Sequence, residues 1–137
     1  MASITAEHPA SPNASELIAE LDAHLEPLYA RESRHGFSVQ KLIDDGVAFF
    51  VIREDGAPVG CGGIKLFGCE YGEIKRMYVR PEFRGRAFGK LMLDHLATHA
   101  KGHGIDVLRL ETGIHRHAAI RLLVQEGFRR IPAFGDY

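Results

Sequence analysis

The feature that most constrains the fold is a strand that turns through a basic, glycine-containing loop into a helix. The apolar run that ends at Val79 is typical of a strand, and Pro81 stops regular structure soon after it. Apolar residues then recur at helical spacing over residues 87–102, at Leu93, Leu96, Ala97 and Ala100. The sequence therefore predicts a strand, a loop at residues 84–90 and a helix as one unit.

Such a unit makes a binding site for an anion. The first N–H groups of a helix have no partner within it, and the helix dipole favours negative charge beside them. Gly85 and Gly89 allow a close approach to the backbone, and Arg84, Arg86 and Lys90 add positive charge. We expect a phosphate here, and with this much charge a pyrophosphate. The alternative is a solvated basic turn, which a basic loop with two glycines often is. The dinucleotide fingerprint and the nucleotide P-loop are both absent.

The loop resembles the acetyl-CoA motif of the GNAT N-acetyltransferases, Arg-x-x-Gly/Ala-x-Gly after a strand that ends in Tyr-Val-x-Pro. Here the motif reads Arg84-x-x-Ala87-x-Gly89 after Tyr78-Val79-Arg80-Pro81. Residues 73–79 look like the family's fourth strand, and residues 119–123 with Gly127-Phe128 look like its later helix and strand. The resemblance covers roughly residues 45–130 and implies acetyl-CoA as co-substrate.

The fold that the resemblance implies is α/β, with a mixed, mostly antiparallel central sheet, one parallel splayed pair of strands and about four helices. The apolar run at residues 47–52 indicates a central strand, and a hairpin joins it to a strand over residues 59–67. Simple alternation would place Ile74 opposite Met77 and Val79, so we predict a β-bulge near Lys75-Arg76. A buried parallel strand is expected at residues 107–110 and a fourth helix at residues 118–126.

Length and composition fit one soluble N-acetyltransferase domain over residues 1–137, with 45% hydrophobic and 26% charged residues. The family usually has one more strand than the chain provides, so that strand is either missing or supplied by a partner in a homodimer. A net charge of −1, from 17 basic and 18 acidic residues, argues against nucleic acid as a partner. A local concentration of cations suits a small anionic ligand instead: Lys75, Arg76, Arg80, Arg84, Arg86 and Lys90.

Location and cysteine chemistry follow from what the sequence lacks. It shows no signal peptide and no bilayer-spanning segment, so we expect a cytoplasmic protein without membrane partners. Cys61 and Cys69 form no metal motif or disulfide framework and are expected as free thiols. His95, His99 and His103 lie one turn apart, but with no convergent further ligand we expect a half-buried helix flank and no metal.

The resemblance also assigns roles in coenzyme binding. It implies that the pantetheine arm pairs with the backbone of Met77, Tyr78 and Val79 in the gap that the bulge opens. It places the pyrophosphate on the loop, formed by Arg84, Gly85, Arg86, Ala87, Phe88, Gly89 and Lys90. His117 stands near the family's coenzyme-binding Asn. Ala87 would be strained if the loop requires a positive φ there.

Catalysis needs a base, because an alkyl amine has a pKa near ~10 and must lose a proton before it attacks. Glu73 occupies the position of the general base in the histone-acetylating relatives, with Glu111 in reserve. The alternative is a surface Glu73 paired with Lys75 or Arg76. The family's thiolate-protonating Tyr is replaced by Leu123, for which Tyr78 is a candidate substitute unless its ring only packs.

The function we predict is acetyl transfer from acetyl-CoA to a primary amine of a small molecule or peptide, by direct attack in a ternary complex. One alternative is a non-catalytic acyl-CoA-binding module, suggested by Leu123. Another is a phosphoprotein- or nucleotide-binding domain. Basic residues hint at an acceptor that carries a carboxylate: Arg31, Arg34, His35 and Arg109.

Overall fold

The computed structural model describes residues 2–24 and 36–110, and within them it forms a sheet of five strands in the order β1-β2-β3-β4-β5. The strands are β1 (Ala2–Ala6), β2 (Ala48–Glu54), β3 (Ala57–Phe67), β4 (Tyr71–Val79) and β5 (Leu108–Arg109). Neighbouring strands run antiparallel except β4 and β5, which are parallel. The mixed α/β sheet with one parallel pair is confirmed.

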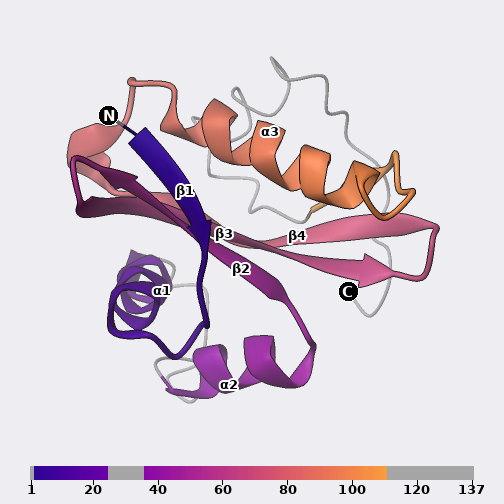
Figure 1. Ribbon diagram of the computed structural model, residues 1–137. Helices are drawn as coiled ribbons and strands as arrows, with labels where there is room; N and C mark the ends of the chain where they lie inside the picture. The colour runs from indigo at the N-terminus through magenta and orange to yellow at the C-terminus, as the bar shows by residue number, and fades with distance from the viewer. Residues whose placement is uncertain (1, 25–35, 111–137) are drawn as a thin grey trace.

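Helices cover both faces of this sheet (Figure 1). Helix α3 (Phe88–Lys101) lies on one face, while α1 (Pro12–His24) and α2 (Gly36–Asp44) lie on the other. A short 3-10 helix, η3 (Pro81–Phe83), follows β4. The N-terminal β1 forms one edge of the sheet.

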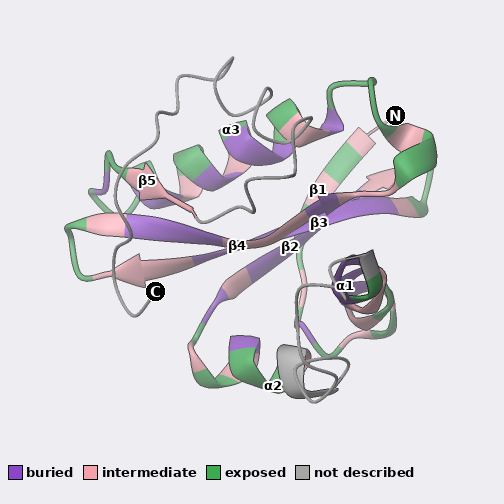
Figure 2. Ribbon diagram, turned by 180° about the vertical axis from the view of Figure 1, so that it is seen from behind, coloured by how far each residue is buried: buried purple, intermediate pink, exposed green. Residues whose placement is uncertain are grey.

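The continuous apolar run of β2 contributes side chains to two hydrophobic cores, because successive side chains of a strand point to opposite faces. Phe50 and Ile52 join the cluster under α3, whereas Phe49 and Val51 join the cluster under α1. The buried interior of the sheet is purple in Figure 2, where it runs along the central strands between the helical layers. The prediction of a central strand here is confirmed.

Glycines in β3 bring neighbouring elements close. A Cβ on Gly62 would lie 2.9 Å from Cγ of Met92, so its absence lets α3 settle onto the sheet. A Cβ on Gly60 would lie 2.7 Å from the carbonyl oxygen of Tyr78. The backbone of β4 therefore approaches β3 closely at the end of β4 that leads into the loop.

The predicted bulge in β4 is confirmed. Cys61 pairs with Tyr78 and Gly63 with Lys75, so two steps along β3 oppose three along β4. Arg76 occupies the extra position with a φ of +50°. The bulge brings Ile74, Met77 and Val79 onto one face, where they pack with the cluster under α3.

Some expectations need correction. Ala97 is exposed because it lies on the outer side of α3. Strand β5 is shorter than predicted, and Val107 is 46% exposed instead of buried. No described helix is long and apolar enough to cross a membrane. The other expected features lie outside the described residues: the fourth helix, the final strand, Glu111, His117, Leu123, Arg31, Arg34 and His35.

Candidate functional site

The loop between η3 and α3 lies at the surface, with residues 84–87 all exposed. Gly85 has a φ of +81° and a Cβ there would meet nothing within 4 Å. Ala87, the residue before α3, also adopts the left-handed conformation, with φ 67° and ψ 15°. The loop therefore needs positive φ at Ala87, where a side chain is disfavoured.

The first turn of α3 leaves backbone N–H groups outside the hydrogen bonds of the helix. The Leu91 N–H donates to the Ala87 carbonyl at 3.0 Å as the first bond of the helix, so the N–H groups of Phe88, Gly89 and Lys90 precede it. The residue at the cap position, Ala87, provides no side-chain hydrogen bond to them. The buried Phe88 ring anchors this turn to the core. These donors and the helix dipole suit a phosphate.

Cations surround these donors. Nε of Arg84 donates to the carbonyl oxygen of Val79 at 3.1 Å. The guanidinium of Arg86 lies over the rings of Phe83 and Phe88, 5.6 and 5.4 Å from their centroids. Both arginines are exposed, so they remain able to contact an anion. Lys90, also exposed, lies 3.6 Å from Asp94.

Glu54, at the end of β2, competes for one of these cations. Its Oε2 lies 3.6 Å from Nη2 of Arg86, whose side chain is about half exposed. An anionic ligand on the loop would therefore share Arg86 with a carboxylate of the protein itself. This contact was not evident from the sequence, because Glu54 precedes a hairpin far from the loop in the chain.

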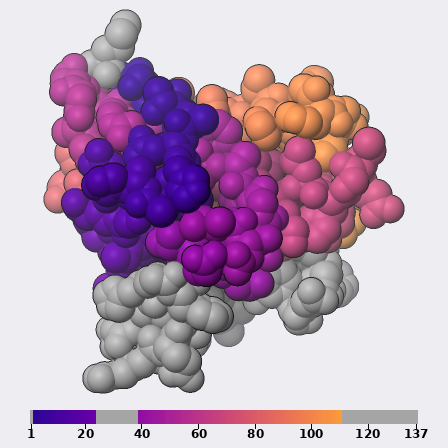
Figure 3. All heavy atoms as spheres, turned by 60° about the horizontal axis from the view of Figure 1, so that its bottom comes forward, coloured from indigo at the N-terminus to yellow at the C-terminus, as the bar shows by residue number. Residues whose placement is uncertain are grey.

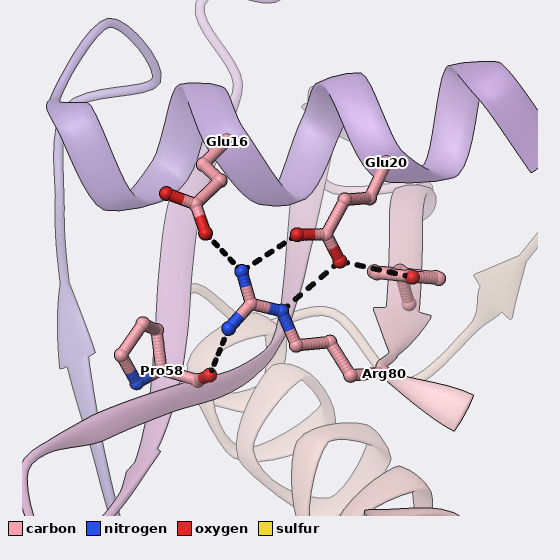
Figure 4. Close-up of polar contacts among 5 residues, drawn as sticks. Glu16, Glu20, Pro58 and Arg80 are labelled. Atoms are coloured by element: carbon pink, nitrogen blue, oxygen red, sulfur yellow. Dashed lines mark hydrogen bonds and ion pairs between the residues drawn. The ribbon is translucent and has the colours of Figure 1, made fainter. Parts of the chain in front are cut away.

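The other three cations of the predicted cluster do not face the loop. Lys75 pairs with Glu73 at 2.9 Å, and Arg76 pairs with Asp22 of α1 at 3.2 Å. Arg80 likewise turns toward α1 (Figure 4). The positive field at the loop therefore comes from fewer residues than the sequence indicated. Carboxylates on the face of the sheet that carries α1 pair with Lys75, Arg76 and Arg80 instead.

Arg80 is enclosed by α1 and β3. Its guanidinium contacts both oxygens of Glu20, at 3.0 and 2.6 Å, and also contacts Glu16, while Nη1 donates to the Pro58 carbonyl at 3.0 Å (Figure 4). These carboxylates, Glu20 first, raise the pKa of Arg80. Sequence reasoning missed this arrangement, although the i, i+4 spacing of Glu16 and Glu20 signalled an acidic stripe on α1.

Tyr78 joins the same group of side chains. It is buried, and its hydroxyl donates to Oε1 of Glu20 at 3.1 Å. Burial, together with Glu20, raises the pKa of Tyr78 to about 12. The hydroxyl thus lies against α1 as a well-bound donor that stays protonated at neutral pH.

Glu73 is buried, with 3% of its surface exposed. Its Oε1 contacts Lys75, and its Oε2 has no hydrogen-bond partner in the part of the chain that the structure describes. Ile74 belongs to the cluster under α3, so Glu73 points to the face that carries α1 and α2. A buried carboxylate oxygen with spare acceptor capacity is able to take a proton.

Within the described residues, β5 pairs with β4 only at Gly72 and Glu73, before the bulge. Pairing with β5 joins Gly72 to Leu108 and Glu73 to Arg109, and Leu110 already lies outside the strand. Among the described residues, the backbone of Met77, Tyr78 and Val79 therefore has strand partners only in β3. An amide-bearing ligand is able to pair with such an edge.

The cysteines differ in environment. Cys61 is fully buried, its Sγ donates to the carbonyl oxygen of Arg76 at 3.4 Å, and burial raises the pKa of its thiol. It therefore supports the bulge and does not act as a nucleophile. Cys69 is exposed on the turn between β3 and β4.

The histidines of α3 pack on an aromatic ring. The rings of His95 and His99 lie edge-on to Phe50, with centroids 4.5 and 5.5 Å away, and desolvation lowers the pKa of both. No cluster of three side chains able to hold a metal ion occurs within residues 2–24 and 36–110.

Comparison with known proteins agrees with this geometry. The model of the acetyltransferase (GNAT) family matches residues 14–128. A protein of Azospirillum brasilense named IAA acetyltransferase is 38% identical over 135 residues, which cover 98% of this chain and 88% of that relative.

Solved structures share the fold. A proposed acyl-CoA N-acyltransferase from Klebsiella pneumoniae superposes with a TM-score of 0.85 at 38% identity, over 100% of this chain and 89% of that chain. A GNAT family acetyltransferase from Elizabethkingia anophelis with acetyl-CoA bound gives a TM-score of 0.75 at 19% identity, over 93% of this chain and 76% of that chain.

Proposed function

Since the chain belongs to the acetyltransferase (GNAT) family, we propose that it carries an acetyl group from acetyl-CoA to a primary amine of a small molecule or peptide. The amine attacks the thioester directly while both substrates are bound. The observation that carries the proposal is the uncapped N-terminus of α3 beneath an exposed basic loop. A loop that served only as a turn would not need an open helix end surrounded by cations.

The coenzyme is bound in two places. The N–H groups of Phe88, Gly89 and Lys90 bind the pyrophosphate, with Arg84 and Arg86 as counter-charges. The pantetheine arm pairs with the open edge of β4 at residues 77–79. In the Elizabethkingia anophelis protein, which has the same fold, acetyl-CoA is bound. The residues of this chain fit such a ligand because the first turn of α3 offers N–H donors beside an exposed loop, and residues 77–79 pair only with β3 among the described residues.

Glu73 acts as the general base. The acceptor ammonium gives a proton to Oε2 of Glu73, directly or through a water molecule, and the amine lone pair attacks the thioester carbonyl carbon. The C–N bond forms, the nitrogen gives its second proton to solvent, the C–S bond breaks, and the coenzyme leaves as a thiolate. Lys75, 2.9 Å from Oε1, keeps the carboxylate oriented.

The thiolate leaves without an acid of its own. A thiol has a pKa near ~8.5, whereas the pKa of Tyr78 is raised to about 12, so proton transfer from the phenol to the thiolate is unfavourable. Tyr78 would also have to leave Glu20 to reach the sulfur. Solvent water protonates the thiolate after it leaves.

Calorimetry with acetyl-CoA tests the proposed binding site. We expect Arg84→Gln and Arg86→Gln each to weaken binding by about tenfold, the effect of losing one charge-assisted hydrogen bond. Lys101→Gln, an exposed charge at the far end of α3, is the matched control and should bind normally. Unchanged affinity in both arginine variants would overturn the proposed coenzyme site.

Thiol release with a panel of amines tests the chemistry. We expect turnover with at least one amine, and Glu73→Gln should lower kcat by about 10²- to 10³-fold while acetyl-CoA affinity stays the same. Tight coenzyme binding without thiol release on any amine would instead indicate a binding module.

A further inference from the structure

Glu73 and Arg109 are register partners in β4 and β5, and theirs is the last pair of these strands within the described residues. Paired residues on neighbouring strands point to the same face, here the face that carries α1 and α2. The strands of a sheet lie about 4.8 Å apart, so the side chains of Glu73 and Arg109 leave the sheet from neighbouring positions.

Arg109 is held in place by an aromatic stack. Its guanidinium lies 4.4 Å from the centroid of the Tyr71 ring. That ring stacks on Phe67 at 4.7 Å with an angle of 11°, and Nζ of Lys65 lies 4.9 Å from the Phe67 ring. A guanidinium held over a ring has a restricted orientation, and its planar shape suits a carboxylate, which a guanidinium binds through two hydrogen bonds.

The stack lies at the surface of the molecule. The four side chains are half-buried, and Figure 3 shows the pink atoms of the β3–β4 hairpin on the outside, beside the orange end of α3. Half-buried cations that an aromatic stack holds in place bind an anion at a smaller entropic cost than mobile surface lysines.

We propose that Arg109 binds the carboxylate of an acceptor whose amine lies beside that carboxylate, as in an amino acid, while Glu73 takes the proton of the amine. The proposal rests on the proposed function and names the substrate class for it. The buried Oε2 of Glu73, without a hydrogen-bond partner in the described residues, provides the acceptor for the cationic half of the ligand. Arg109, preoriented by Tyr71, provides the donor for the anionic half.

The surrounding charge favours a zwitterion over a polyamine. Lys65 and Lys75 lie on the same face as Arg109, where Lys65 is 3.9 Å from Asp45 and Lys75 is 2.9 Å from Glu73, so cations of the protein already offset these carboxylates. The carboxylates of α1 that could attract a polyamine, Glu20 and Asp22, are already bound to Arg80 and Arg76.

The test measures the rate of thiol release at saturating acetyl-CoA. It compares the common L-amino acids as acceptors with their amides, their dipeptides and plain alkylamines. We expect a kcat/KM at least about tenfold higher for an amino acid than for its amide. Arg109→Gln should remove this preference by raising KM for the amino acid about 10- to 100-fold. Its effect on the kcat/KM for the amide should be much smaller than its effect on the kcat/KM for the amino acid.

Two further variants keep the test specific. Arg109→Lys retains the charge but loses the bidentate geometry, so it should lose less of the preference for amino acids than Arg109→Gln does. Lys101→Gln removes an exposed cation of α3, which covers the opposite face of the sheet from Arg109, and should retain the preference for amino acids. The inference would be overturned if the wild type were equally active on amino acids and their amides, or if Arg109→Gln kept the wild-type preference for amino acids. Either result would leave the proposed acetyl transfer intact.

Failure of the proposed function would look different, as an absence of thiol release with every amine. The inference is then decided by NMR titration of the coenzyme-bound protein with the same amino acids. Shifts at Tyr71 and Arg109 that Arg109→Gln abolishes would support the carboxylate site, and no shifts would overturn it.

Discussion

The guanidinium of Arg80 contacts both carboxylate oxygens of Glu20, 60 residues earlier in the chain, with Nε 3.0 Å from Oε1 and Nη2 2.6 Å from Oε2. This bidentate pair ties α1 to the end of β4, immediately before the loop that we assign to the coenzyme. Bidentate pairs of this kind are stronger than single contacts because two hydrogen bonds share one fixed geometry.

Glu20→Gln should therefore lower the free energy of unfolding by about 1–2 kcal/mol, since it weakens the contacts to Arg80 and Tyr78 in a partly exposed setting. Urea denaturation measures this change. Glu16→Gln, one turn earlier and more exposed, is the matched control and should cost less than Glu20→Gln. Equal losses in the two variants would show that the bidentate geometry is unimportant.

Tyr78→Phe should leave kcat almost unchanged, because the hydroxyl is bound to Glu20. A loss of about 100-fold or more would instead identify Tyr78 as the acid that protonates the thiolate. Steady-state kinetics at saturating acetyl-CoA makes this measurement.

The same variant should alter stability at alkaline pH. The folded state raises the pKa of Tyr78 from 10.0 to about 12, so the unfolded chain releases this proton first. The stabilisation is fully present below pH 10.0 and is lost as the pH rises toward about 12. Urea denaturation across this interval should show a steeper fall in wild type than in Tyr78→Phe. Parallel slopes would contradict the assigned environment.

Ala87→Gly should stabilise the protein by about 0.5–1 kcal/mol, because it relieves a left-handed conformation while adding some freedom to the unfolded chain. The matched control is Ala97→Gly at an exposed, right-handed position of the same helix, which should destabilise by about 1 kcal/mol. Thermal or urea denaturation of both variants decides the point. The opposite signs are the diagnostic result, and destabilisation by both would show that Ala87 is unstrained.

Glu54→Gln should tighten acetyl-CoA binding by about two- to fivefold, since it removes a carboxylate that shares Arg86 with the pyrophosphate. Calorimetry at low and high salt should show the gain shrinking as salt screens the charges. Glu82→Gln removes an exposed charge of η3, also near the loop, and controls for net charge. Equal gains in acetyl-CoA affinity in both variants would show that Glu54 acts only through the net charge and not through its contact with Arg86.

Local patterns predicted local structure well. The broken alternation at Ile74 and Met77 predicted the bulge, because the side-chain period of a strand leaves few ways to bury both. The open helix end was predictable because Ala87 cannot cap it.

Pairing between distant charges was not predictable. The sequence shows that Arg80 is cationic. Only the packing of α1 on β4 shows that its side chain faces Glu20 and not the loop. The aromatic support of Arg109 was hidden in the same way, since it needs β3, β4 and β5 side by side. Such contacts depend on tertiary geometry, which a one-dimensional pattern does not contain.

The contrast between the two cysteines has a practical consequence for chemical labelling. Cys61 is enclosed at the bulge, whereas Cys69 is exposed at a turn. An alkylating reagent should therefore modify one sulfur per folded molecule and two after denaturation. The ratio reports on the integrity of the sheet, and Cys69 offers a single attachment point for a spectroscopic probe at the tip of the β3–β4 hairpin.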